Sequence, residues 1–306
     1  MLQGYALRPS FNVAGVDYAV GVPAGTVLTD WQALSGPGIT VRADASPPYV
    51  RVDNTSNVVI SGVDFSLHGG AYLFFVNSPS PTVMSSKFGG TNLILIPAGV
   101  IDADSASPNL TVTHSTMGGG GLAIFGATTP WTESGLINNT GGGTTTLTYN
   151  WLKNIPQHVL EENQQTPIHA IVIYRNNLVE QAGWGPGAHL NYLQFSYGAI
   201  DSVDVEYNTF YNTPHVASSG ESLQFYGVGG YVHNATWAYN VMIATGGIPG
   251  SGGSAFIHGG WPDTQNSGVG HDNYVDTTGA YFLYYPGSMT GWTLANNYNM
   301  VTGAPD

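Results

Sequence analysis

The chain of 306 residues contains no cysteine, which excludes disulfide bonds, a thiol nucleophile and thiolate metal ligands. Charged residues make up 8% of the sequence, far below the share in an ordinary globular protein. Six residues are basic, none of them after Arg175, and the net charge is −13. Because so few cations cannot form a basic patch, we expect no nucleic-acid partner.

Long hydrophobic runs are missing as well. Apolar stretches such as residues 93–100 are too short to cross a bilayer, so we expect no membrane insertion. Residues 1–40 show no signal peptide. The abundance of Thr, Ser, Asn and Gly is nevertheless typical of extracellular proteins built from β-strands, and it predicts an extracellular or cell-surface location.

What the sequence does contain is a short pattern that returns about once every thirty residues. An apolar run leads to a small or Asn turn residue, and another apolar residue follows two positions later, as in residues 203–210. Repetition at this period indicates stacked structural units. We place the turn residues at Val63, Ser86, Ser115, Asn150, Asn176, Asn208, Asn240, Asn273 and Asn296.

The residues around each turn predict strands. Apolar residues three before and two after the turn lie at strand spacing and should point inward. The chain between them is short, β-branched and polar-alternating, and no segment shows a sustained helical period. Asn suits such a turn because it tolerates positive φ, and stacked Asn side chains can bond one another.

This pattern resembles the right-handed parallel β-helices of the pectate-lyase-like superfamily, over roughly residues 40 to 300. The resemblance implies an all-β solenoid of about nine to ten three-stranded coils, with an Asn ladder between the second and third strands. We expect residues 1–40 to cap its lower end and residues 41–306 to form a single β-helix domain. The superfamily includes lyases, hydrolases, tailspikes and adhesins, so the resemblance predicts architecture more strongly than activity.

A second pattern identifies the face that would carry chemistry. Before each turn an aliphatic residue is followed by a polar one, and in a strand the first would point inward and the second outward. Stacking would place the polar members in one outward column, with neighbours about 4.8 Å apart. The predicted column comprises Asp53, Asn77, Asp102, Asn138, Glu161, Gln194, Gln224, His258 and Tyr284, with Asp104, Asn163, Ser196 and Tyr226 beside it.

In the superfamily this first-strand sheet floors the saccharide groove, so the resemblance implies a polysaccharide partner. Amide, phenol and imidazole groups hydrogen-bond well to sugar hydroxyls, and Trp side chains in Gly-rich loops can stack on pyranose faces. Alternatively, the Trp residues cover the core at the ends of the coils. The expected substrate-binding residues are Asn138, Gln194, Gln224, Tyr226, Trp184, Trp261, His189 and His215.

Two carboxylates in the column predict a hydrolase. Asp102 and Glu161 would lie two rungs apart, about 9.6 Å between backbones, close to the carboxyl separation of inverting glycosidases. Glu161, beside neutral amides, would have a raised pKa and act as the acid, while Asp102 or the neighbouring Asp104 would activate water. The alternative is a solvated acidic surface without a catalytic role.

A polysaccharide lyase is the second hypothesis. His258 would act as base in β-elimination from a uronate, with Tyr226 or Tyr192 returning the proton. No cofactor is required, but calcium is possible because neighbouring coils offer carboxylate ligands. These calcium ligands would be Asp102, Asp104, Glu161 and Glu162.

The lyase hypothesis departs from the superfamily in one respect. β-Helix pectate lyases abstract the proton with a Lys or Arg in the calcium-lined groove. Here Lys153 and Arg175 flank turns away from the predicted groove, and Arg51 lies outward on the first coil alone. A non-catalytic glycan-binding or structural β-helix, monomeric or trimeric as in related tailspikes, is the third hypothesis; we favour the hydrolase.

Overall fold

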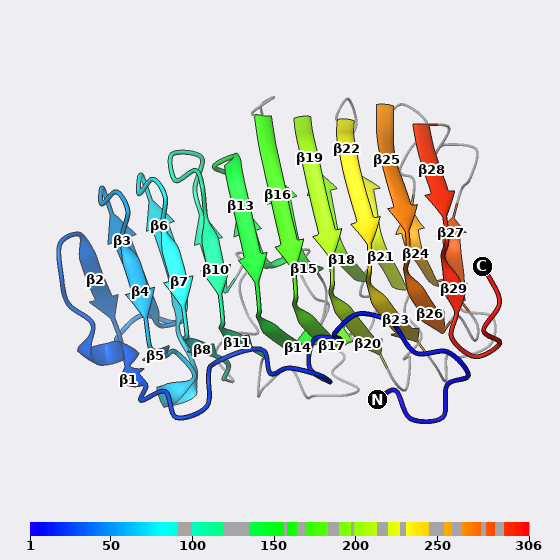
Figure 1. Cartoon of the computed structure of the whole chain (residues 1–306). Coiled ribbons are helices and arrows are strands. Elements are labelled where there is room, and N and C mark those ends of the chain that lie inside the picture. Colours follow the sequence, from blue (N-terminus) through cyan, green and yellow to red (C-terminus); the bar gives the residue numbers. More distant parts are fainter. Residues whose placement is uncertain are drawn as a thin grey trace.

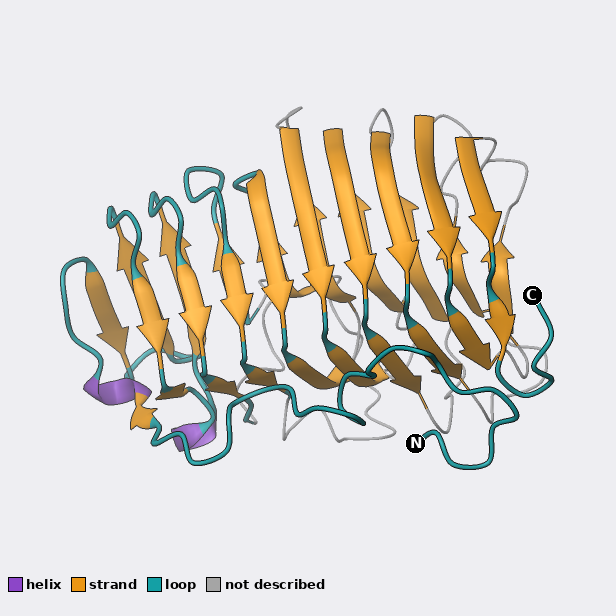
Figure 2. Cartoon of the chain, viewed as in Figure 1, coloured by secondary structure: helices purple, strands orange, loops and turns teal. Residues whose placement is uncertain are grey.

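The strands of the chain stack into three long sheets, which confirms the predicted all-β, right-handed parallel β-helix (Figure 1). The structure is a computed structural model and describes residues 1–90, 100–118, 135–155, 158–163, 169–182, 190–196, 199–212, 220–226, 231–244, 254–258, 265–276, 280–284 and 291–305. Within these ranges two short 3₁₀ helices occur, η1 (Trp31–Ala33) and η2 (Leu67–Gly69) (Figure 2). No described helix is long and apolar enough to span a membrane.

Each coil passes through the three sheets in turn. Sheet 1 contains β2 (Ile39–Arg42), β3 (Tyr49–Asp53), β6 (Tyr72–Val76), β9 (Ile101–Ala103), β12 (Gly135–Asn139), β15 (His158–Asn163), β18 (Leu190–Ser196), β21 (Gly220–Tyr226), β24 (Ser254–His258) and β27 (Ala280–Tyr284). Sheet 2 contains β4 (Val59–Ser61), β7 (Thr82–Met84), β10 (Thr111–Thr113), β13 (Gly143–Thr148), β16 (His169–Arg175), β19 (Ala199–Glu206), β22 (Tyr231–Ala238), β25 (Gln265–His271) and β28 (Gly291–Ala295). Sheet 3 contains β1 (Thr29–Asp30), β5 (Val63–Asp64), β8 (Lys87–Phe88), β11 (Thr116–Met117), β14 (Trp151–Ile155), β17 (Leu178–Ala182), β20 (Thr209–Asn212), β23 (Val241–Ala244), β26 (Tyr274–Asp276) and β29 (Tyr298–Asn299).

The core runs along the axis of the solenoid and is filled by the inward residues of every strand. On sheet 1 many of these are aliphatic and fully buried, as at Ile101, Ile137 and Leu160, and others are aromatic, as at Phe75. Aromatic rings continue the stack on the other sheets, where Phe210 and Trp237 lie parallel with centroids 5.5 Å apart. Each such side chain contributes roughly 1.5–3 kcal/mol through burial, so the stack accounts for much of the stability.

The turn between sheets 2 and 3 lies where the repeat predicted it, but two of its residues are shifted by one position. The buried residues are Asn177 and Asn297, whereas Asn176 and Asn296 precede them with φ values of 58° and 54°. The same arrangement occurs in another coil, where Tyr149 has a positive φ and the next residue, Asn150, is buried. The left-handed residue is therefore the one before the inward Asn, and a sequence with two adjacent Asn residues does not indicate which of them turns inward.

The inward residues of this turn are hydrogen-bonded from coil to coil. The Oδ1 atom of Asn208 accepts from the backbone N–H of Asn177 at 2.9 Å, and its Nδ2 atom donates to the carbonyl of Tyr174 at 2.8 Å and to Oδ1 of Asn240 at 3.1 Å. These bonds satisfy backbone groups that the turn leaves without a sheet partner. The column comprises Ser86, Ser115, Asn150, Asn177, Asn208, Asn240, Asn273 and Asn297.

Residues 1–28, which we expected at the lower end of the solenoid, lie along its side as a strap (Figure 1). The strap begins at the last coil, where the N–H of Leu7 donates to the carbonyl of Met300. The ring of Phe11 packs edge-on against Tyr207 and Tyr274 midway. The strap then reaches β1, which pairs with β5 in the first coil, and β2 pairs with β3 at that end of sheet 1.

Candidate functional site

The register of sheet 1 aligns the predicted outward column from its third member onward. Asp102 pairs with Asn138, which pairs with Glu161, and Glu161 pairs with Gln194. The alignment continues through Gln224, His258 and Tyr284. Residues flanking the column, such as Ile137, are buried. The backbone therefore brings the two carboxylate positions to one face, two rungs or about 9.6 Å apart.

The first two members of the column were predicted wrongly. The register partner of Asp102 on β6 is Phe74, and that of Phe74 on β3 is Arg51. Asn77 instead follows β6 with φ 49°, in the turn toward sheet 2. Four consecutive apolar residues on β6, from Leu73 to Val76, hid the alternation, because the aliphatic-then-polar rule does not recognise an aromatic residue that points outward.

Asp102 has an unusual environment for a carboxylate. It is partly buried between its neighbours in the column, and this loss of solvation raises its pKa to about 6. A hydrogen bond from the side chain of Asn138 acts in the opposite direction, and the negative charge of Asp104 adds to the rise. The carboxyl group therefore exchanges its proton near pH 6 rather than near pH 4, which brings it closer to the range suited to proton transfer at neutral pH.

Asn138 has a free acceptor beside that carboxyl group. Its side chain bonds to Asp102, while its Oδ1 atom is buried and has no hydrogen-bond partner among the described residues. Leaving a buried acceptor unpaired typically costs about 1–3 kcal/mol. Because the atom is enclosed, it offers no direct contact to a ligand in this conformation, and the substrate-binding role of Asn138 stays a prediction.

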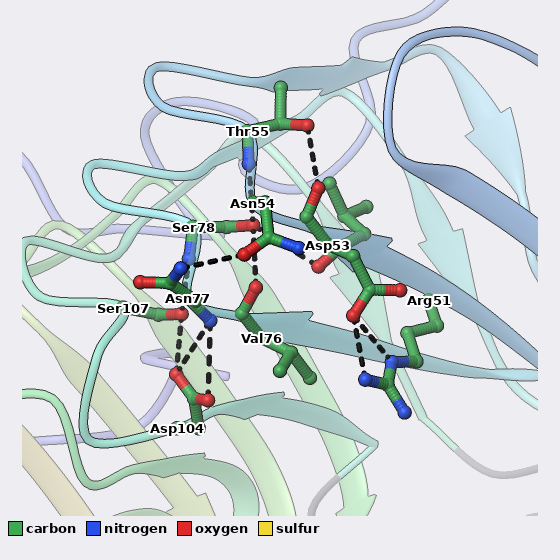
Figure 3. A network of polar contacts seen from close by, with 10 residues as sticks. Arg51, Asp53, Asn54, Thr55, Val76, Asn77, Ser78, Asp104 and Ser107 are labelled. Atoms are coloured by element: carbon green, nitrogen blue, oxygen red, sulfur yellow. Dashed lines mark hydrogen bonds and ion pairs between the residues drawn. The ribbon is translucent and has the colours of Figure 1, made fainter.

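Asp104 is committed to the turn that follows β9 (Figure 3). Its carboxylate accepts from the N–H of Asn77 at 3.1 and 3.2 Å, from the N–H of Ala106 at 3.1 Å and from Oγ of Ser107 at 2.7 Å. These bonds tie two coils together at the turn. Asp102 is therefore the better candidate of the two for chemistry.

The histidine and tyrosine candidates have different outcomes. Tyr192, considered as an acid, lies in the core with its ring 4.6 Å from that of Phe210, and burial raises its pKa well above the usual range, so that role is wrong. His158, a further histidine at the start of β15 on sheet 1, is buried as well. The backbones of Tyr226 and His258 lie on sheet 1, as predicted. Trp184, Trp261, His189 and His215 lie outside the described residues.

The predicted calcium ligands do not share one column. Glu161 has the outward Asn138 as register partner, whereas Glu162 pairs with Asn139 and Phe195, whose side chains are buried. Within the described part of the chain no group of three or more His, Asp or Glu side chains could hold a metal ion. The calcium site stays a prediction.

The basic residues later in the chain lie on the other two sheets, as predicted. On sheet 3 the Nζ atom of Lys153 lies over the ring of Trp151, 3.8 Å from the ring centroid. Arg175 on sheet 2 pairs with Asp204 at 2.7 Å and Glu206 at 2.9 Å. Neither residue is available to abstract a proton from a ligand on sheet 1.

Comparison with known proteins identifies no family. No protein-family model matches the chain, and no curated protein matches it. Among solved structures, the chain is similar to the catalytic domain of a GH87 α-1,3-glucanase in complex with nigerose, with 10% sequence identity and a TM-score of 0.24. That match covers 80% of this chain and 50% of the glucanase domain, so the chain spans half the length of that structure.

Proposed function

We propose that this β-helix cleaves a polysaccharide, as a glycoside hydrolase with Asp102 and Glu161 as its carboxyl pair. The observation that carries the proposal is the register of β9, β12 and β15, which aligns Asp102, Asn138 and Glu161 on the outward face of sheet 1. Two rungs of about 4.8 Å leave room for a water molecule between the carboxyl groups, as inversion requires.

The environment of Asp102 supports assigning it the acid role. With a pKa of about 6 it retains its proton in a fraction of molecules at neutral pH. In this assignment Asp102 donates its proton to the glycosidic oxygen as the bond to the anomeric carbon breaks. Glu161 accepts a proton from the water molecule that attacks the opposite face of the sugar. The roles are the reverse of those expected from the sequence, because burial raises the pKa of Asp102.

The proposal is tested with a panel of neutral and uronate-containing polysaccharides, since the sugar is unidentified. We expect new reducing ends without the ultraviolet absorbance of an unsaturated uronate, and a first-formed product of inverted anomeric configuration by NMR. Appearance of the unsaturated product would contradict hydrolysis and establish a lyase. Binding without cleavage across the panel would instead support a non-catalytic glycan-binding β-helix.

A further inference from the structure

Sheet 1 extends beyond the first coil, and its outward face there is aromatic and cationic. β2 pairs antiparallel with β3, so Arg42 faces the same side as its register partner Tyr49. The alternating residue Val52 is fully buried, which places Tyr49 and Arg51 outward. Phe74 is the register partner of Arg51 on β6. We call Arg42, Tyr49, Arg51 and Phe74 the first-coil platform.

The aromatic rings of the platform are held in fixed positions. The ring of Phe74 lies edge-on to that of Tyr49, with centroids 5.7 Å apart, and nearly parallel to that of Tyr72 at 6.1 Å. Tyr72 is buried, whereas Tyr49 and Phe74 are partly exposed. A fixed, partly exposed ring offers an apolar surface on which the C–H face of a sugar can stack.

The charges of the platform are already balanced by carboxylates of the same strands and turns. The guanidinium of Arg42 donates to Asp44 at 2.8 and 3.1 Å, and that of Arg51 donates to Asp53 at 2.8 Å. Arg51 and Asp53 keep side-chain exposures of 46% and 26%, so both still reach a ligand. Because the two charges cancel, such a pair can donate to and accept from the hydroxyl groups of a neutral ligand. The net charge of −13 further disfavours a polyanion.

We infer that the first-coil platform is a binding subsite for a neutral sugar residue of the substrate, beside Asp102. This inference rests on the proposed function and specifies its substrate class as a neutral polysaccharide. Arg51, Phe74 and Asp102 occupy successive rungs about 4.8 Å apart, so a chain stacked on Phe74 continues directly onto the carboxyl column. The cleaved bond, between Asp102 and Glu161, then lies about two rungs beyond the stacked ring.

The test compares Phe74→Ala, Phe74→Leu and Arg51→Lys with the wild-type protein, using the polymer from the panel that is bound best. Lys keeps the charge of Arg51 but loses its planar pairing geometry, and Leu keeps apolar volume without a ring. We expect Phe74→Ala and Arg51→Lys each to raise Kd, and KM where cleavage occurs, about tenfold with kcat unchanged. Phe74→Leu should also weaken binding. Ile171→Ala, at a residue 42% exposed on sheet 2, is the control and should change nothing.

The outcomes separate this inference from the proposed function. Binding without cleavage that Phe74→Ala weakens supports the subsite and refutes the hydrolase. Cleavage of a neutral polymer with unchanged KM in all platform variants, each shown to be folded by its melting temperature, refutes the subsite alone. Tighter binding of a uronate polymer than of every neutral one refutes the neutral substrate class. Absence of binding to every polymer refutes both.

Discussion

Replacing Asp102 with Asn is expected to reduce cleavage at least a hundredfold while stabilising the fold at neutral pH. The loss of activity follows because an amide cannot donate the proton that the leaving oxygen needs, and general acid catalysis contributes about 10²–10⁴-fold. The gain in stability follows from burial, which raises the pKa of this carboxyl group from 3.8 to about 6 in the folded state. A shift of this size corresponds to up to about 3 kcal/mol at pH 7.

The sign of this effect gives a pH dependence that can be measured. Between about pH 4 and pH 6 the folded state keeps the proton of Asp102 while the unfolded state loses it, so the free energy of unfolding falls as the pH rises. Denaturant unfolding of the wild type and Asp102→Asn across this range should show the fall in the first and a smaller fall in the second. Parallel curves would contradict the burial of this carboxyl group.

Replacing Asn208 with Leu is expected to cost about 3–5 kcal/mol of unfolding free energy, because buried polar groups lose their partners at about 1–3 kcal/mol each. The N–H of Asn177 would lose its acceptor and the carbonyl of Tyr174 its donor. Thermal or denaturant unfolding measures the loss. Asn208→Ser should cost less, because Ser115 at the same place in its own coil still accepts from the N–H of Ser86.

Asn296→Gly is the matched control for that experiment. Asn296 is exposed and has a φ of 54°, which glycine adopts without strain, so we expect a change within about 0.5 kcal/mol. An equal loss for Asn208→Leu and Asn296→Gly would contradict the distinction between the buried column and the left-handed residues beside it.

The repeat was sufficient to predict the solenoid, because inward apolar residues and a polar turn must recur at each coil for the stack to close. It also placed Asp102, Asn138 and Glu161 in one column. Each strand has an aliphatic residue that must point inward, and this requirement sets how neighbouring short strands align. The local rule failed at Phe74, where hydrophobic character does not distinguish an inward from an outward side chain. The outward aromatic residue is also the one that the proposed subsite uses.

Other features depend on contacts that no local pattern encodes. The strap of residues 1–28 is held by bonds such as that from Leu7 to Met300, between opposite ends of the sequence. Asp104, like Asp102, follows an apolar residue in the sequence. Its carboxylate nevertheless accepts hydrogen bonds from Asn77 and Ser107 in the turns between strands. The raised pKa of Asp102 likewise depends on neighbours from adjacent coils, and it reversed the assignment of acid and base.

The central claim is that cleavage takes place on the outward face of sheet 1, between Asp102 and Glu161. It is tested most directly by a crystal structure of the Asp102→Asn variant bound to an oligosaccharide of a polymer that the wild type cleaves. We predict a sugar ring stacked on Phe74 and a glycosidic oxygen within hydrogen-bonding distance of the side chain at position 102. An oligosaccharide bound on sheet 2 or sheet 3, or full activity in this variant, would contradict the claim.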